Sequence, residues 1–149
     1  MRLINEIIVH CTANRPGCKM TLKDFRDLHV KVNGWSDIGY HYVIFEDGRV
    51  EPGRPISKAG AHCKKGGHNA HSIGIAYVGG LSTTGVCTDT RTPAQKSAML
   101  KLITNLIKLY RCDVYGHRDF DKGKECPCFD AHKEYTNIYR REVGLPVIV

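Results

Sequence analysis

Short apolar segments that are typical of β-strands alternate with helical patterns along this chain. Four such segments lie at 3–9, 40–45, 72–78 and 112–115. The first is continuous enough in apolar residues at 7–9 to be buried on both faces of a sheet, and the third is another apolar strand. Asp47-Gly48 follows the second segment and predicts a hairpin that returns through residues 49–51. Strands interleaved with helices predict an α/β domain, in which a central mixed β-sheet is flanked by about three α-helices.

Three helices are predicted by the residues that cap them. Thr92-Pro93-Ala94-Gln95 combines an N-cap threonine, a proline at the first helical position and the glutamine of a capping box. Thr21 opens a shorter helix to about Val32, and Asp130 caps a last helix to about Val143. The buried face of the central helix recurs at helical spacing and comprises Met99, Leu102, Ile103, Leu106 and Tyr110.

Length and charge restrict the class of protein. A chain of 149 residues predicts a single domain over 1–149, which we expect to be monomeric. No apolar stretch is long enough to span a membrane, and residues 1–6 are typical of a first strand rather than a signal peptide, so we expect synthesis in the cytoplasm. The net charge of +7 favours a polyanionic partner, but the basic residues are dispersed, which disfavours a specific nucleic-acid module.

The cysteines form an odd set without repeated Cys-x-x-Cys pairs, which disfavours a structural zinc ribbon. We expect most of them to be reduced, and sequence spacing does not reveal which of them would pair. The seven are Cys11, Cys18, Cys63, Cys87, Cys112, Cys126 and Cys128.

Two histidines and a cysteine form a candidate metal site. His10 directly follows the first apolar segment, His117 follows the last predicted strand, and Cys126 comes after eight intervening residues. Adjacent strand ends share one edge of an α/β sheet, so His10 and His117 are expected to converge there. Two imidazoles and a thiolate can bind Zn²⁺ and leave a fourth position open for water.

Other residues compete for these roles. Cys128 lies close enough in sequence to replace Cys126 as a ligand, whereas Cys11 is expected to point away from His10 into the core. A histidine at a strand end is also often a hydrogen-bonded structural residue. Four further histidines are candidates for the metal site: His41, His62, His68 and His71.

Several short motifs follow one another in a characteristic order. They are Ile-Val-His-Cys-Thr-Ala at 8–13, Gly-Trp at 34–35, Gly-Tyr-His-Tyr at 39–42, Asp-Gly-Arg-Val-Glu-Pro-Gly-Arg at 47–54, Ala-Gly-Ala-His at 59–62, Ser-Ile-Gly-Ile at 72–75 and Lys-Glu-Cys-Pro-Cys-Phe-Asp at 124–130. This ordered set resembles the N-acetylmuramoyl-L-alanine amidases, and in particular their phage lysozyme and peptidoglycan-recognition protein branch. The resemblance extends from the first strand to the start of the last helix.

The resemblance implies a role for each matching residue. It implies that His10, His117 and Cys126 are the zinc ligands, and it favours Cys126 over Cys128 because the family cysteine precedes the proline. Tyr40 matches a tyrosine beside the metal-bound water, and Lys124 matches the lysine of the phage-type enzymes. His62 and Asn69 match positions that face the substrate.

These residue types suit amide hydrolysis. Zinc lowers the pKa of its bound water and polarises a carbonyl, so that this water can attack the lactyl carbonyl next to L-alanine. The Lys124 ammonium can stabilise the oxyanion. The Tyr40 hydroxyl is expected to position the water, since a tyrosine pKa of about 10 makes it a poor base.

The implied substrate is peptidoglycan or a muropeptide, cleaved between N-acetylmuramic acid and L-alanine. Action on the cell wall would follow a phage-type or non-classical release. The alternatives are a non-catalytic peptidoglycan-binding module and a protein that binds a polymerase or another polyanion. Non-catalytic relatives typically lack the cysteine ligand, so Cys126, together with Tyr40 and Lys124, favours an enzyme.

Overall fold

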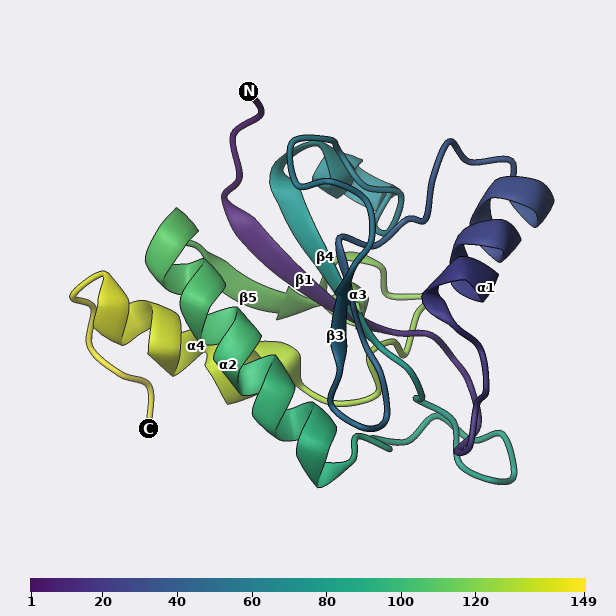
Figure 1. Ribbon diagram of the computed structural model, residues 1–149. Helices are drawn as coiled ribbons and strands as arrows, with labels where there is room; N and C mark the ends of the chain where they lie inside the picture. Colours follow the sequence, from purple (N-terminus) through teal and green to yellow (C-terminus); the bar gives the residue numbers. More distant parts are fainter.

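Five strands form one mixed sheet in the order β3-β2-β4-β1-β5 (Figure 1). The computed structural model describes all residues from 1 to 149. Strand β4 is parallel to β1 and β2, β5 is parallel to β1, and only β3 is antiparallel to its neighbour β2. The strand bounds are Glu6–Cys11 for β1, Tyr42–Ile44 for β2, Val50–Pro52 for β3, Ser72–Tyr77 for β4 and Asp113–Gly116 for β5.

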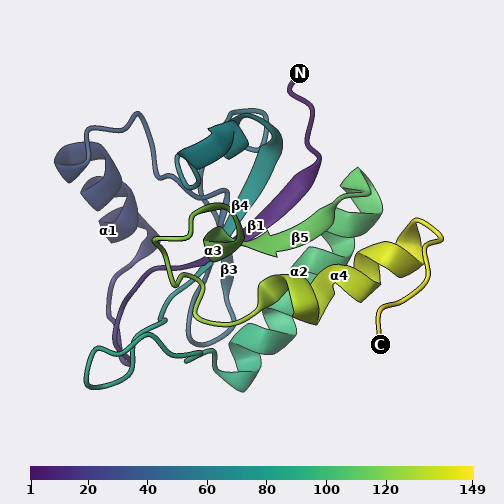
Figure 2. The ribbon, with the colours of Figure 1, turned by 180° about the vertical axis from the view of Figure 1, so that it is seen from behind.

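Helices cover both faces of this sheet (Figures 1 and 2). On one face, α2 (Pro93–Tyr110) and α4 (Ala131–Glu142) pack against each other and against Ile7, Val9 and their neighbours in the main core. On the other face, Phe25 of α1 (Leu22–Asp27) packs on Val43 in a smaller core. The α/β prediction with about three flanking helices is therefore confirmed.

The capping signals in the sequence correspond to real helix ends. Thr92 and Gln95 form the predicted capping box, and Thr21 caps α1 in the same way with Asp24. The buried face of α2 includes Met99, Ile103 and Leu106 as predicted and also Ile107, whereas Leu102 and Tyr110 are only partly buried.

Several local structures differ from the sequence prediction. The first strand is Glu6–Cys11 rather than 3–9, so His10 lies within β1 and not just after it. The α1 helix ends at Asp27, and Leu28–Val32 form a wider π-helical turn in which the Asn33 N–H donates to the Leu28 carbonyl. The loop that precedes β4 contains the 3₁₀ helix η2 (Lys65–His71). A four-residue helix, α3 (His117–Phe120), begins immediately after β5.

One disulfide is present, between Cys87 and Cys128. It joins the loop that precedes α2 to the segment that leads into α4. The other five cysteines form no disulfide. None of the helices is both long and apolar enough to cross a membrane.

Candidate metal centre and active-site groove

The ends of two adjacent parallel strands bring His10 and His117 together. His10 is the fifth residue of β1, and His117 follows the last residue of β5, which pairs with Val9. The two imidazole rings lie 4.7 Å apart, centroid to centroid. The predicted convergence at one sheet edge is therefore observed.

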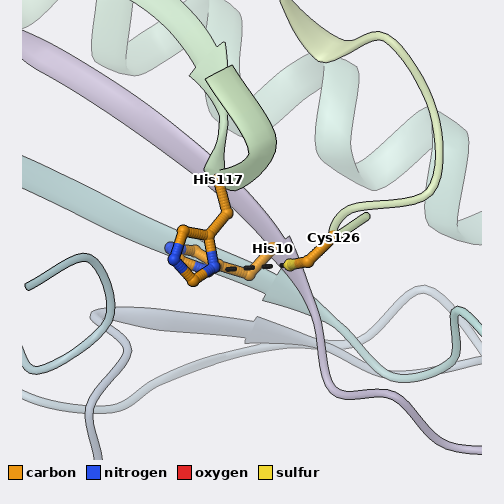
Figure 3. Close-up of side chains that lie close together, drawn as sticks. All are labelled: His10, His117 and Cys126. Carbon is orange, nitrogen blue, oxygen red and sulfur yellow. Dashed lines mark hydrogen bonds between the residues drawn. The ribbon is translucent and has the colours of Figure 1, made fainter. Parts of the chain in front are cut away.

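Cys126 reaches this edge from the loop between α3 and α4. Its carbonyl accepts from the Arg118 N–H at 2.8 Å, and its Sγ accepts from the Cys11 N–H at 3.2 Å. Cys126 Sγ lies 3.8 Å from His10 Nδ1, and the donor atoms of all three side chains lie within 4.8 Å of one another (Figure 3). Cys128 is held by Cys87 in the disulfide, which removes it as a competing ligand.

The donor set fits a tetrahedral zinc ion. Zn–N bonds of about 2.0–2.1 Å and a Zn–S bond of about 2.3 Å separate N and S ligands by roughly 3.6 Å, close to the distance between His10 and Cys126. Contact with the Cys11 thiol and burial both raise the pKa of Cys126, so its thiolate needs a cation beside it. Two nitrogens and one sulfur leave a fourth position for a substrate or water.

A chain of hydrogen bonds behind His10 sets its tautomer. His10 Nδ1 faces Cys126, so the neutral ring carries its proton on Nε2, which lies 2.8 Å from His62 Nδ1. His62 then carries its own proton on Nε2 and donates to Ser72 Oγ at 3.2 Å, and Ser72 Oγ donates to the His68 carbonyl at 2.7 Å. Burial lowers the pKa of both His10 and His62, which keeps them neutral.

Two glycines make room for the His62 ring. A Cβ at Gly74 would lie 2.6 Å from His62 Cδ2, and a Cβ at Gly60 would lie 2.5 Å from the same atom. Their absence of a side chain explains why a histidine from a loop can be buried between β4 and His10. Glycine at positions 60 and 74 is therefore required by the packing of His62 beside His10.

A groove opens over the three donors. Two cavities of about 310 and 320 Å³ share five lining residues and adjoin there. Lys64, Lys65 and Asn69 line the first, and Tyr40 lines the second. The shared residues are Trp35, Ala61, His62, His117 and Lys124.

The other predicted site residues occupy different positions around this groove. Tyr40 is partly buried with its ring 5.4 Å from that of His10, and burial raises its pKa, so the hydroxyl stays protonated. Lys124 is exposed at the groove. Asn69 Oδ1 accepts from the N–H groups of His62 and Cys63 at 2.9 and 2.8 Å and so holds this loop.

The remaining candidate histidines lie outside the cluster of three donors. His41 is buried and accepts from the Gly74 N–H, as expected for a packed structural residue. His68 and His71 lie beside Glu6 at the opposite end of β1. Sequence reasoning missed Ser72 and the two glycines; the only available signal was their place in the motifs.

Comparisons with known proteins identify the family of this chain. Residues 1–129 match the family described as N-acetylmuramoyl-L-alanine amidase. The endolysin of Escherichia phage T7 is 38% identical over 129 residues, which cover 87% of this chain and 83% of the endolysin. Peptidoglycan-recognition protein SC1a of Drosophila melanogaster is 33% identical over 133 residues, covering 83% of this chain and 68% of that protein.

Solved structures share the fold over nearly the whole chain. The N-acetylmuramoyl-L-alanine amidase LysC from Clostridium intestinale URNW aligns with a TM-score of 0.74 and 30% identity, covering 96% of this chain and 87% of LysC. Drosophila PGRP-LB aligns with a TM-score of 0.72 and 26% identity, covering 91% and 81%. The chain therefore belongs to the type 2 N-acetylmuramoyl-L-alanine amidases, and it hydrolyses the amide bond between N-acetylmuramic acid and L-alanine in peptidoglycan.

Proposed function

We propose that His10, His117 and Cys126 bind one Zn²⁺ that serves this amidase reaction. The observation that carries the proposal is their convergence: three donor atoms from three separate segments lie within 4.8 Å of one another at the floor of a groove. The hydrogen bond behind His10 adds support, because metal-binding histidines are commonly oriented in this way.

The groove residues supply the rest of the chemistry. Bound zinc would polarise the scissile carbonyl and lower the pKa of a water molecule. The Lys124 ammonium stabilises the carbonyl oxygen as it gains negative charge. The protonated Tyr40 hydroxyl donates a hydrogen bond and orients the attacking water, because its raised pKa makes it a poor base.

For His62 and Asn69, the contacts favour positioning over direct substrate binding. His62 fixes the tautomer of His10, and Asn69 holds the backbone of His62 and Cys63. Both also line the groove, so a substrate passes next to them. Their first effect is to keep the metal ligands and the groove wall in place.

The substrate is a peptidoglycan strand or a soluble muropeptide. Lys64, Lys65 and Lys124 surround the groove with positive charge, which suits the carboxylates of a stem peptide. Lys65 forms an ion pair with Asp121 at 3.7 Å, so Lys64 is the more available of the two lysines for a substrate carboxylate. The chain acts as a single monomeric amidase domain over 1–149, and its similarity to endolysins favours action on the wall after release.

Digestion of purified sacculi tests this proposal. The wild type should release stem peptides that begin with a free L-alanine and leave the glycan strands intact, as read by mass spectrometry. A chelator or Cys126→Ser should remove about 99.9% of the rate, since the metal supplies several kcal/mol and each 1.36 kcal/mol is a factor of ten.

Cys18→Ser is the matched control, because Cys18 is a free and partly exposed cysteine away from the groove. It should retain the wild-type rate. Unchanged turnover in Cys126→Ser would show that the ligand assignment is wrong.

A further inference from the structure

A second cluster of metal-ligating side chains lies at the other end of β1. Glu6 begins this strand, four residues before His10. Because side chains alternate along a strand, the two side chains project from the same face, about 13 Å apart along the strand. The facing segment is η2, which carries His68 and His71 and whose N-terminal part lines the groove.

The three side chains converge on one carboxylate oxygen. Nδ1 of His68 contacts Glu6 Oε1, and Nδ1 of His71 lies 3.2 Å from the same oxygen. All three donor atoms lie within 4.8 Å of one another. The His68 and His71 rings are 5.5 Å apart, so both project toward Glu6 rather than stacking on each other.

One polar atom of this cluster lacks a hydrogen-bond partner in the protein, whereas His68 Nδ1 and Glu6 Oε1 are hydrogen-bonded to each other. His71 Nδ1 is buried and makes no hydrogen bond, although it lies near Glu6 Oε1. The Glu6 side chain is 10% exposed, and its only ionic partners are these two imidazoles. A buried carboxylate without a permanent cation is costly, and so is a buried nitrogen without a partner. A bound cation would satisfy both.

The donor set identifies the class of cation. Two imidazole nitrogens and one carboxylate oxygen are ligands that Zn²⁺ accepts, whereas Mg²⁺ and Ca²⁺ prefer oxygen. Tetrahedral bonds of about 2.0–2.1 Å separate N and O ligands by roughly 3.3 Å, close to the 3.2 Å between His71 and Glu6. His68 Nδ1 lies closer to the same oxygen because it is hydrogen-bonded to it, so a bound metal would replace this hydrogen bond and move the His68 ring outward. We propose that Glu6, His68 and His71 form a second Zn²⁺ site, separate from the one at His10.

This second site would fasten the groove wall to the sheet. The His68 ring stacks on Phe120 at a centroid distance of 3.8 Å, and Phe120 ends the short helix that His117 begins. The His68 carbonyl also accepts from Ser72, the last member of the hydrogen-bond chain behind His10. A metal on His68 would therefore restrain His117 through Phe120 and His62 through Ser72. This is a structural role rather than a catalytic one.

A count of bound zinc tests the proposal. The full-length protein is stripped of metal, given three equivalents of Zn²⁺, desalted and analysed by plasma mass spectrometry. We expect two zinc ions per wild-type chain and one per His71→Gln chain. His132→Gln is the matched control and should keep two, because His132 faces Asp113 at 3.9 Å without a third donor.

Cobalt distinguishes the two sites. Wild type and His71→Gln should both show thiolate-to-Co²⁺ charge transfer from Cys126, and only the wild type should show the additional d–d absorption of a nitrogen–oxygen site. The second equivalent of metal should also raise the Tm of the wild type and leave that of His71→Gln unchanged. The same zinc count in wild type and His71→Gln overturns the proposal, whereas one zinc in wild type and none in His71→Gln would overturn the site at His10 instead.

Discussion

The hydrogen bond from His10 to His62 provides a quantitative test of how the proposed metal centre is built. His62→Leu keeps a side chain of similar size and removes the acceptor 2.8 Å from His10 Nε2. Leaving a buried N–H without a partner costs about 1–3 kcal/mol. Loss of such a partner typically lowers metal affinity about 10–100-fold, which corresponds to about 1.4–2.7 kcal/mol. The two magnitudes agree.

The assay is competition for zinc with a chromogenic chelator, in parallel with steady-state kinetics at saturating zinc. We expect the zinc Kd to rise about 10–100-fold and KM to change little. His132→Leu is the matched control, since His132 packs on Tyr115 away from both His10 and the groove, and its zinc affinity should stay within about twofold of wild type. A raised KM with an unchanged zinc Kd would refute the positioning role of His62 and favour a direct contact with substrate.

Three further outcomes follow from particular contacts. Gly74→Ala places a Cβ 2.6 Å from the His62 ring. We therefore expect urea denaturation to show a loss of about 1–3 kcal/mol in the free energy of unfolding, together with weaker zinc binding. Gly123→Ala is the control and should leave the free energy of unfolding unchanged, because its nearest contact is at 3.5 Å. Lys124→Met should lower kcat about 100-fold with little change in KM, and an unchanged kcat would exclude Lys124 from oxyanion stabilisation. Burial lowers the pKa of His41 to about 4, against about 6.5 in the unfolded chain. Between pH 4 and 6.5 the unfolded state therefore binds a proton at His41 that the folded state does not. The free energy of unfolding, measured by urea denaturation, should fall by about 3 kcal/mol as the pH drops from 6.5 to 4. In His41→Gln this part of the pH dependence should disappear.

The sequence predicts those parts of the fold that local physics determines. The apolar run through Ile7 and Val9 can only be a buried strand, and Thr92 with Gln95 satisfies the first N–H groups of α2. The convergence of His10 and His117 follows from parallel neighbouring strands, whose carboxyl ends share an edge. These features need no knowledge of distant contacts beyond the sheet itself.

Other features depend on tertiary contacts that spacing does not encode. His62 lies in a polar loop and is typical of a surface residue, yet it is buried because Gly60 and Gly74 leave space for its ring. The pairing of Cys87 with Cys128 brings together residues 41 positions apart, and no sequence rule selects that partner. The choice of Cys126 over Cys128 likewise came from the family motif and not from spacing.

Short structural elements are the third class that sequence reasoning missed. The α3 helix has four residues and a glycine at its N-cap, although the Asp119 side chain accepts from the Gly116 N–H, so it carries no periodic signal. The η2 segment contains Gly66 and Gly67 at positive φ, which masks its helical turns in a glycine-rich loop. Both segments contribute residues to the groove, so the two elements that the sequence does not predict belong to the site.

The central claim is that one sulfur and two imidazole nitrogens bind the catalytic zinc. X-ray absorption spectroscopy measures the ligands of this zinc directly. The His71→Gln variant, loaded with one equivalent of zinc, is used so that zinc bound at Glu6, His68 and His71 does not contribute to the spectrum. We expect one Zn–S distance of about 2.3 Å and nitrogen ligands at about 2.0–2.1 Å, with the sulfur contribution lost in His71→Gln/Cys126→Ser. A shell without sulfur, or one with two sulfurs, would contradict this claim.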